Sequence, residues 1–151
     1  MTPAGSIEVT YDEHYIYRAV FKECTSEKLL NHSGQLGSQI KHQLESYVKN
    51  PHHRFQLPLK PLGSSYQQRV WSALLVIPVG RTITYGELSN LLQSSPRAIG
   101  QACKTNPLAL FIPCHRVVGK NDQGGYMGCA NALQYKRALL QHESYDLCLQ
   151  S

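Results

Sequence analysis

The stretch Ile112-Pro113-Cys114-His115-Arg116-Val117 is the part of the sequence around which this chain is organised. The five apolar residues Leu108–Ile112 lead into it, and such a run predicts a buried strand that ends at the cysteine. A free cysteine is more often a small core hydrophobe than a reactive group. However, Pro113 fixes its own backbone angle and favours extended geometry before it. The basic pair His115-Arg116 is a setting that lowers a thiol pKa, so we predict a nucleophile at Cys114.

The composition predicts an ordinary globular protein of a reducing compartment. With 151 residues, of which 42% are hydrophobic, the chain can form one domain or two small ones without disulfides. Its five cysteines are an odd number without a CxxC pair, and no signal peptide or long apolar run occurs. We therefore expect no membrane span and a cytoplasmic location, nucleoid-associated in a bacterium or nuclear in a eukaryote.

Positive charge is concentrated in the middle of the chain. The formal net charge is +5. Residues 63–120 contain six Lys or Arg against the single acidic Glu87, whereas residues 1–62 contain seven against six. A basic segment of this kind favours a polyanionic partner such as nucleic acid, although many ordinary soluble proteins are also mildly basic.

The first 62 residues predict a small α/β domain. Two-residue alternation over Ile7–Tyr11 and Tyr15–Lys22 predicts an antiparallel pair of strands. Apolar residues at i, i+4, i+7 and i+8 predict a helix over Gly37–Asn50, which the following proline ends. A third strand-like segment covers Phe55–Leu59, and the Pro-rich Leu57–Gly63 is the predicted linker. We find no convincing chemistry in this domain.

The same domain contains four residues of types that bind zinc. Cys24, His32, His52 and His53 are ligand types that zinc prefers. Their spacing fits no standard zinc finger, so exposed histidines without a special task are the preferred interpretation. We expect neither a metal nor a cofactor.

Residues 63–151 predict a mostly helical second domain. Each of its helices begins with side chains that cap free backbone N–H groups. The predicted caps are Ser65 with Gln68, Thr84 with Glu87, Ser95 before Pro96, and Asn131 with Gln134. The helices are expected to end before Pro78, near Leu92, near Thr105 and at Glu143. The predicted fold class of the whole chain is therefore α/β (α+β).

The second and third of these helices predict a helix-turn-helix, because only a short turn separates them. Helical hairpins also occur in proteins that never contact DNA. Here the pair lies in the basic segment, and its second helix carries Arg97 in the first turn. Small residues along that helix, Ala98, Gly100 and Ala102, allow a close approach to a DNA groove.

The segment Pro113–Val117 resembles the acceptor motif of the O6-alkylguanine-DNA alkyltransferases, also called methylated-DNA-protein-cysteine methyltransferases. The resemblance extends from about Tyr66 to Glu143, and further matching segments follow the order of the family. These segments are Ile83–Leu88, Arg97–Gly100, Asn106-Pro107, Gly125-Tyr126 and Lys136–Glu143. Each one alone is weak evidence, whereas together they are strong.

The resemblance implies direct repair of alkylated DNA. The sulfur of Cys114 would take an alkyl group from O6 of guanine and keep it, because a thioether is a poor leaving group. His115 would act through a bridging water, since successive residues of an extended chain point to opposite sides. Glu143 would orient His115, Tyr85 would donate a proton to the leaving guanine, and Asn106 would tie the second helix of the pair to the cysteine strand.

The resemblance also implies a guanine pocket and a set of DNA contacts. The implied pocket residues are Tyr126, Val117, Met127 and Lys136, and the implied DNA contacts are Arg97, Tyr85, Gly86 and Lys120. Arg97 would enter the base stack in place of a flipped nucleotide. The partner would be double-stranded DNA carrying O6-alkylguanine, and we expect the protein to act as a monomer.

The chain departs from the family pattern near the pocket. Met127–Cys129 replaces a run of small residues, extra residues precede Lys136, and the segment between Tyr85 and Arg97 is short. Pocket shape, the preferred alkyl group and activity on O4-alkylthymine are left open.

Two other functions are compatible with parts of the sequence. A Cys-His protease or thioesterase would leave the basic helix pair without a purpose. A non-catalytic lesion sensor or helix-turn-helix regulator could share the scaffold, but the presence of Cys114 favours the enzyme.

Overall fold

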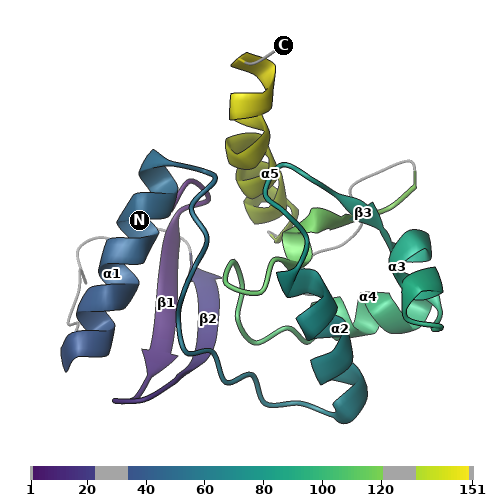
Figure 1. Cartoon of the computed structure of the whole chain (residues 1–151), viewed down its shortest axis with the longest axis horizontal. Helices are drawn as coiled ribbons and strands as arrows, with labels where there is room; N and C mark the ends of the chain where they lie inside the picture. The colour runs from purple at the N-terminus through teal and green to yellow at the C-terminus, as the bar shows by residue number, and fades with distance from the viewer. Residues whose placement is uncertain (1, 23–33, 121–131, 150–151) are drawn as a thin grey trace.

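The computed structural model describes residues 2–22, 34–120 and 132–149, the last five of these by backbone alone, and shows an α/β fold. Along the chain lie β1 (Ser6–Tyr11), β2 (Ile16–Lys22), α1 (Gly34–Lys49), α2 (Ser65–Leu75), β3 (Ile83–Thr84), α3 (Tyr85–Leu91), α4 (Pro96–Lys104), the 3-10 helix η1 (Cys114–Arg116), β4 (Val117–Val118) and α5 (Ala132–Leu149). β1, β2 and α1 lie on one side, α2 to α4 on the other, and α5 rises between them (Figure 1). The division into domains at residue 62 stays a prediction.

The predicted antiparallel pair of strands is confirmed. β1 pairs with β2 in a register that places Ile7 opposite Phe21 and Val9 opposite Ala19. The predicted strand over Phe55–Leu59 is wrong, because only Leu59 forms a bridge, to Ile16 of β2. Within that segment the N–H of Leu59 donates to the carbonyl of Leu57 at 2.9 Å, around a proline that has no N–H for a ladder.

α1 begins three residues before its predicted start and buries part of its apolar stripe, including Tyr47.

The capping box of α2 lies one residue earlier than predicted. Ser64 accepts from the N–H of Gln67, whose side chain accepts from the N–H of Ser64. The sequence contains two overlapping Ser-x-x-Gln pairs, so the pattern alone did not distinguish them.

Trp71 of α2 forms a hydrogen bond to α4. The indole Nε1 donates to the carbonyl of Ala102 at 2.9 Å, and the ring packs against the backbone at Gly63. A Cβ at Gly63 would lie 2.5 Å from the Trp71 ring, so a larger residue there would displace the indole.

The predicted caps of α3 and α4 are confirmed. Thr84 and Glu87 form the capping box of α3, and Ser95 accepts from the N–H of Ala98 at the start of α4. The two helices are consecutive and in contact. β3 pairs in parallel with β4, Ile83 opposite Val117, which brings the start of α3 beside the segment that follows the cysteine.

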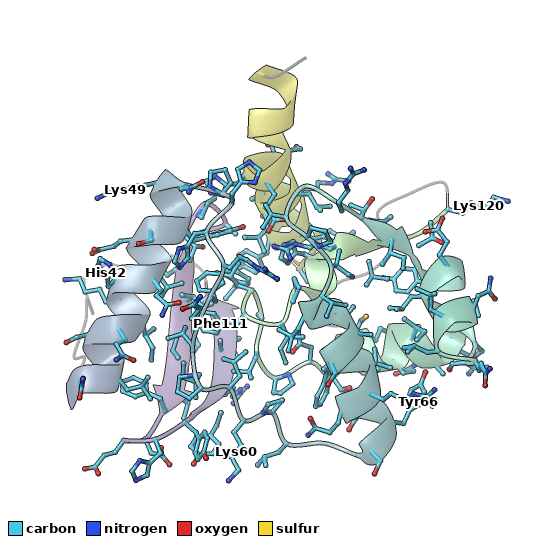
Figure 2. All side chains as sticks on the ribbon, in the orientation of Figure 1. His42, Lys49, Lys60, Tyr66, Phe111 and Lys120 are labelled. Atoms are coloured by element: carbon cyan, nitrogen blue, oxygen red, sulfur yellow. The ribbon has the colours of Figure 1, made fainter. Side chains whose placement is uncertain are left out.

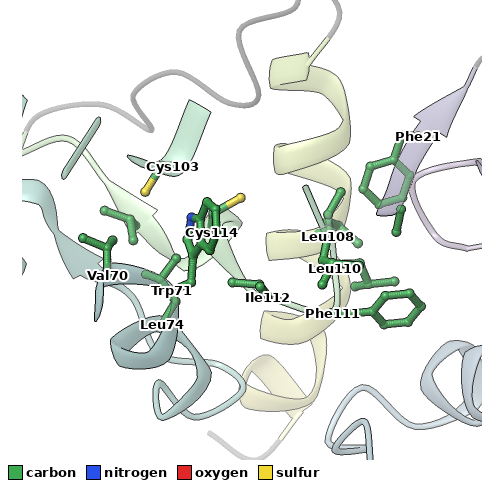
Figure 3. Close-up of a cluster of buried hydrophobic side chains, with 14 of the residues drawn as sticks. Phe21, Val70, Trp71, Leu74, Cys103, Leu108, Leu110, Phe111, Ile112 and Cys114 are labelled. Carbon is green, nitrogen blue, oxygen red and sulfur yellow. The ribbon is translucent and has the colours of Figure 1, made fainter. Parts of the chain in front are cut away.

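The predicted strand over Leu108–Ile112 is wrong, although the segment is buried as expected. Only Leu108 forms a bridge, to Ala19, and the chain then turns sharply. The N–H of Phe111 donates to the carbonyl of Ala109 around Leu110, whose φ is +72°. The side chains of Leu108, Leu110, Phe111 and Ile112 belong to the buried hydrophobic cluster (Figure 3). An apolar run therefore indicated burial, which a strand and a tight turn satisfy equally well.

α5 extends to Leu149, six residues beyond its predicted end at Glu143. Its predicted cap residue, Asn131, lies outside the described residues. Among the helices of the described part of the chain, none is long and apolar enough to cross a membrane.

Candidate active site

Cys114 is the first residue of the one-turn helix η1 and is 2% exposed. Its N–H donates to the carbonyl of Ile112 at 2.8 Å, across a γ-turn in which Pro113 has φ −82° and ψ 62°. The proline ring restricts φ to this range, so the sequence itself selects the turn. The N–H of Val117 donates in turn to the carbonyl of Cys114, which closes η1. The thiol is thus held by a turn and a helical turn rather than by a strand.

Asn106 contacts the sulfur directly. Its side-chain Nδ2 donates to Cys114 Sγ at 3.1 Å and to the carbonyl of Ile112 at 3.0 Å. Its Oδ1 accepts from the N–H of Leu108 at 2.9 Å, and this third bond fixes the amide with its nitrogen toward the sulfur. An N–H directed at sulfur favours the thiolate, the form that attacks.

His115 follows the cysteine and is completely buried. Its Nε2 lies 2.7 Å from Oε1 of Glu143 on α5. The other ring nitrogen, Nδ1, has no hydrogen-bond partner among the described residues. Successive side chains of a 3-10 helix diverge by about 120°, so those of His115 and Cys114 point in different directions. The sequence also predicted that they diverge, but on an extended strand.

Glu143 is a buried carboxylate with four hydrogen-bond donors. Oε1 accepts from His115, from the Tyr47 hydroxyl at 3.0 Å and from Arg116 Nη2 at 3.0 Å, and Oε2 accepts from Arg116 Nε at 3.1 Å. Arg116 is itself anchored because its Nη1 donates to the carbonyl of Ile77 at 2.7 Å.

The protonation states of the pair follow from this arrangement. Burial opposes ionisation of Glu143, but the bonds from His115 and Arg116 outweigh it and lower its pKa to about 2. Burial lowers the pKa of His115, and the positive charges of Arg116 and Lys136 act in the same direction. The site therefore holds a neutral imidazole, protonated on Nε2, against an ionised carboxylate.

Lys136 connects three elements of the site. It is completely buried, and its Nζ donates to the carbonyl of Val117 at 2.6 Å. The same ammonium lies 5.7 Å from the ring centre of Tyr85, the first residue of α3. The structure thus brings together three residues that the sequence assigned to the pocket or to catalysis.

The predicted DNA contacts lie nearer the surface. Arg97, in the first turn of α4, is exposed, and a Cβ at Gly86 would meet nothing closer than Thr84 Oγ1 at 3.9 Å. Lys120 is exposed at the outer edge of the molecule on the side of α3 (Figure 2). The pocket residues Tyr126 and Met127 lie outside the described residues.

Two residues of the site were not assigned by the sequence. Tyr47 was counted only as part of the apolar stripe of α1, and no local pattern signals a partner 96 positions away. Arg116 was expected only to lower the thiol pKa, and its ion pair with Glu143, at 3.0 Å, was not predicted.

Cys103 is a second buried thiol in the core that contains Cys114 (Figure 3). Burial raises the pKa of Cys103 well above its usual range, so this thiol stays protonated and is not a nucleophile.

The sequence did not favour a zinc site, and of its four candidate ligands only His52 and His53 lie in the described residues. Cys24 and His32 lie outside the described residues. In the described ranges, no group of three or more His, Cys, Asp or Glu side chains could hold a metal ion.

Comparison with known proteins identifies relatives over most of the chain. Residues 65–145 match the family described as 6-O-methylguanine DNA methyltransferase, DNA binding domain. A methylated-DNA-protein-cysteine methyltransferase of Methanosarcina mazei is 40% identical over 111 residues, which cover 72% of this chain and 69% of that protein.

Solved structures extend the similarity to the whole fold. The crystal structure of Mycobacterium tuberculosis O6-methylguanine methyltransferase matches with a TM-score of 0.81 and 32% identity, over 99% of this chain and 95% of that one. The structure of Mycobacterium tuberculosis OGT in complex with DNA matches with a TM-score of 0.77 and 34% identity, over 95% and 90% of the two chains. From its sequence and its fold, this chain belongs to the 6-O-methylguanine DNA methyltransferase family.

Proposed function

We propose that this chain repairs DNA by moving the alkyl group of O6-alkylguanine to the sulfur of Cys114, once per molecule. Its membership of the family supports DNA repair by alkyl transfer. The observation that carries the residue-level proposal is the sulfur itself, which is buried and receives an N–H from Asn106 at 3.1 Å. The base is neutral His115, the next residue in the chain, which ionised Glu143 holds in place.

The reaction is a displacement at the alkyl carbon. Sulfur forms a bond to that carbon, the carbon–oxygen bond breaks, and guanine keeps the electron pair. The thiol proton passes through water to His115 Nδ1, the nitrogen that has no partner among the described residues. The Tyr85 hydroxyl supplies a proton to the leaving guanine, and the proton that His115 took from the thiol then passes through water to the Tyr85 oxygen. The thioether product cannot release its alkyl group, so the protein is consumed.

Lys136 supports the pocket rather than the displacement itself. Its ammonium fixes the carbonyl of Val117 and faces the ring of Tyr85. A nearby positive charge favours ionisation of a phenol, which assists donation of its proton to guanine. The Val117 carbonyl retains a second lone pair for the guanine amino group, and Tyr126 and Met127 are proposed to complete the pocket.

The target base reaches the sulfur only after it leaves the duplex, at a cost of a few kcal/mol. Arg97 is exposed at the start of α4, where a guanidinium can enter the vacated stack. Lys120 and the start of α3 at Tyr85 and Gly86 are proposed to contact phosphates, which position a protein without reading sequence. We propose that the protein acts as a monomer in the cytoplasm on double-stranded DNA.

The test uses duplex DNA that carries a radiolabelled methyl group on O6 of guanine. The wild-type protein should become labelled to at most one methyl per molecule, and Cys114→Ala should take up none while still binding the DNA. Cys103→Ala, which removes the other described free thiol, should remain active. Several turnovers per molecule, or labelling of Cys114→Ala, would contradict the proposal. Binding of alkylated DNA without any transfer would favour the lesion sensor.

A further inference from the structure

Tyr47 links the N-terminal helix α1 to the proposed active site. The residue is completely buried, and its hydroxyl donates to Glu143 Oε1 at 3.0 Å. That oxygen is the one that holds His115 Nε2 at 2.7 Å. The phenol and the imidazole therefore share one acceptor atom, although 68 positions separate them in the chain.

The backbone of Tyr47 is held as firmly as its side chain. In a continuing helix its carbonyl would accept from residue 51, but Pro51 has no N–H. His142 Nε2 lies 2.8 Å from this carbonyl and supplies the missing donor. The Tyr47 ring also packs against His142 and Phe55, with ring centres 5.0 and 5.3 Å away. These contacts fix the ring in the position from which its hydroxyl donates to Glu143.

The charged and titratable groups that face the His115–Glu143 pair come from three elements. Arg116 of η1 donates twice to the carboxylate, and the ammonium of Lys136 on α5 acts on His115. α1 contributes Tyr47, whose backbone carbonyl is in turn bonded to His142 of α5. Burial keeps Tyr47 protonated by raising its pKa above the usual range, so its hydroxyl is a permanent donor.

We propose that Tyr47 is a positioning residue for the alkyl transfer, which keeps His115 neutral by sharing its carboxylate partner. A donor on Glu143 Oε1 withdraws negative charge from the atom that stabilises a protonated imidazole. The N-terminal part of the chain thereby takes part in setting the base of the reaction. The inference rests on the proposed transfer to Cys114.

Tyr47→Phe tests the proposal because it deletes only the hydroxyl and keeps the ring packing. Without this donor the carboxylate attracts the proton of imidazolium more strongly, so the pKa of His115 rises. The rate of transfer should then begin to decline at a higher pH than in the wild type, because protonated His115 cannot act as the base. On the acidic limb of the pH profile the variant should be up to about tenfold slower, whereas at about pH 8.5 the two rates should agree.

The rates are measured with free O6-benzylguanine, which requires no base flipping, and the His115 ring is followed by NMR titration. Tyr17→Phe is the matched control, because Tyr17 likewise donates its hydroxyl to a carboxylate, Asp12, in the N-terminal part of the chain. The control should reproduce the wild-type pH profile. An unchanged profile in Tyr47→Phe would overturn the inference, and so would an equal loss at every pH. A wild-type protein that transfers no alkyl group at all would instead overturn the proposed function.

Discussion

Replacing Glu143 with glutamine should remove a pH-dependent part of the folding stability. The side chain is 1% exposed, and its pKa falls from an ordinary 4.5 to about 2 because His115 and Arg116 donate to it. That difference of about 2.5 pH units corresponds to roughly 3.5 kcal/mol, at about 1.4 kcal/mol for each unit. The folded-state pKa is depressed, so this stability is present above pH 4.5 and is lost as the pH falls toward 2.

The assay is urea denaturation of the wild type and Glu143→Gln at pH 7 and at about pH 3.5. By the linkage relation, the wild type should lose about 1.4 kcal/mol more free energy of unfolding than the variant over this interval. The effects of all other carboxyl groups cancel in the comparison. Glu8→Gln is the control, because Glu8 forms a surface ion pair with Lys22 at 2.9 Å, and exposed pairs contribute little. A difference between wild type and Glu143→Gln that does not change with pH would refute the reasoning.

Three further predictions concern the sulfur, the helix pair and the basic segment. Asn106→Ala should lower the free energy of unfolding by about 1–3 kcal/mol, measured with urea, because it leaves the N–H of Leu108 unpaired in the core and removes one of the two donors to the carbonyl of Ile112. Arg97→Ala should slow repair of duplex DNA by roughly tenfold to a thousandfold but affect free O6-benzylguanine much less; equal losses would mean that Arg97 supports the fold. Affinity for duplex DNA should fall linearly with salt on logarithmic axes, and an affinity independent of salt would favour a regulator.

Short-range signals predicted much of the fold. The alternation over the first two strands and the caps at Thr84 and Ser95 depend on residues close together in the chain, and the structure confirms them. The restricted φ of the proline before Cys114 also fits the structure, although the sequence predicted a strand rather than a turn at this point. The family resemblance added the pairing of His115 with Glu143, which their separation of 28 positions hides from any local pattern.

Other features depend on contacts that the sequence does not encode locally. The apolar run that ends at Ile112 has to be buried, but burial alone does not distinguish a strand from the tight turn at Leu110. We expected α5 to end at Glu143, although no glycine or proline follows there to stop the helix. The sequence predicts that Tyr47 is a core residue of α1. Only the contact between α1 and α5 reveals that its hydroxyl donates to Glu143.

The intact mass of the protein, measured after mixing with duplex DNA containing O6-methylguanine, tests the central claim most directly. The account predicts a gain of one methyl group per molecule, and peptide mapping should place it on Cys114, which receives the Asn106 N–H. Cys103, buried in the same core, should remain unmodified. An unchanged mass, a methyl group on any other residue, or more than one methyl group per molecule would contradict the account.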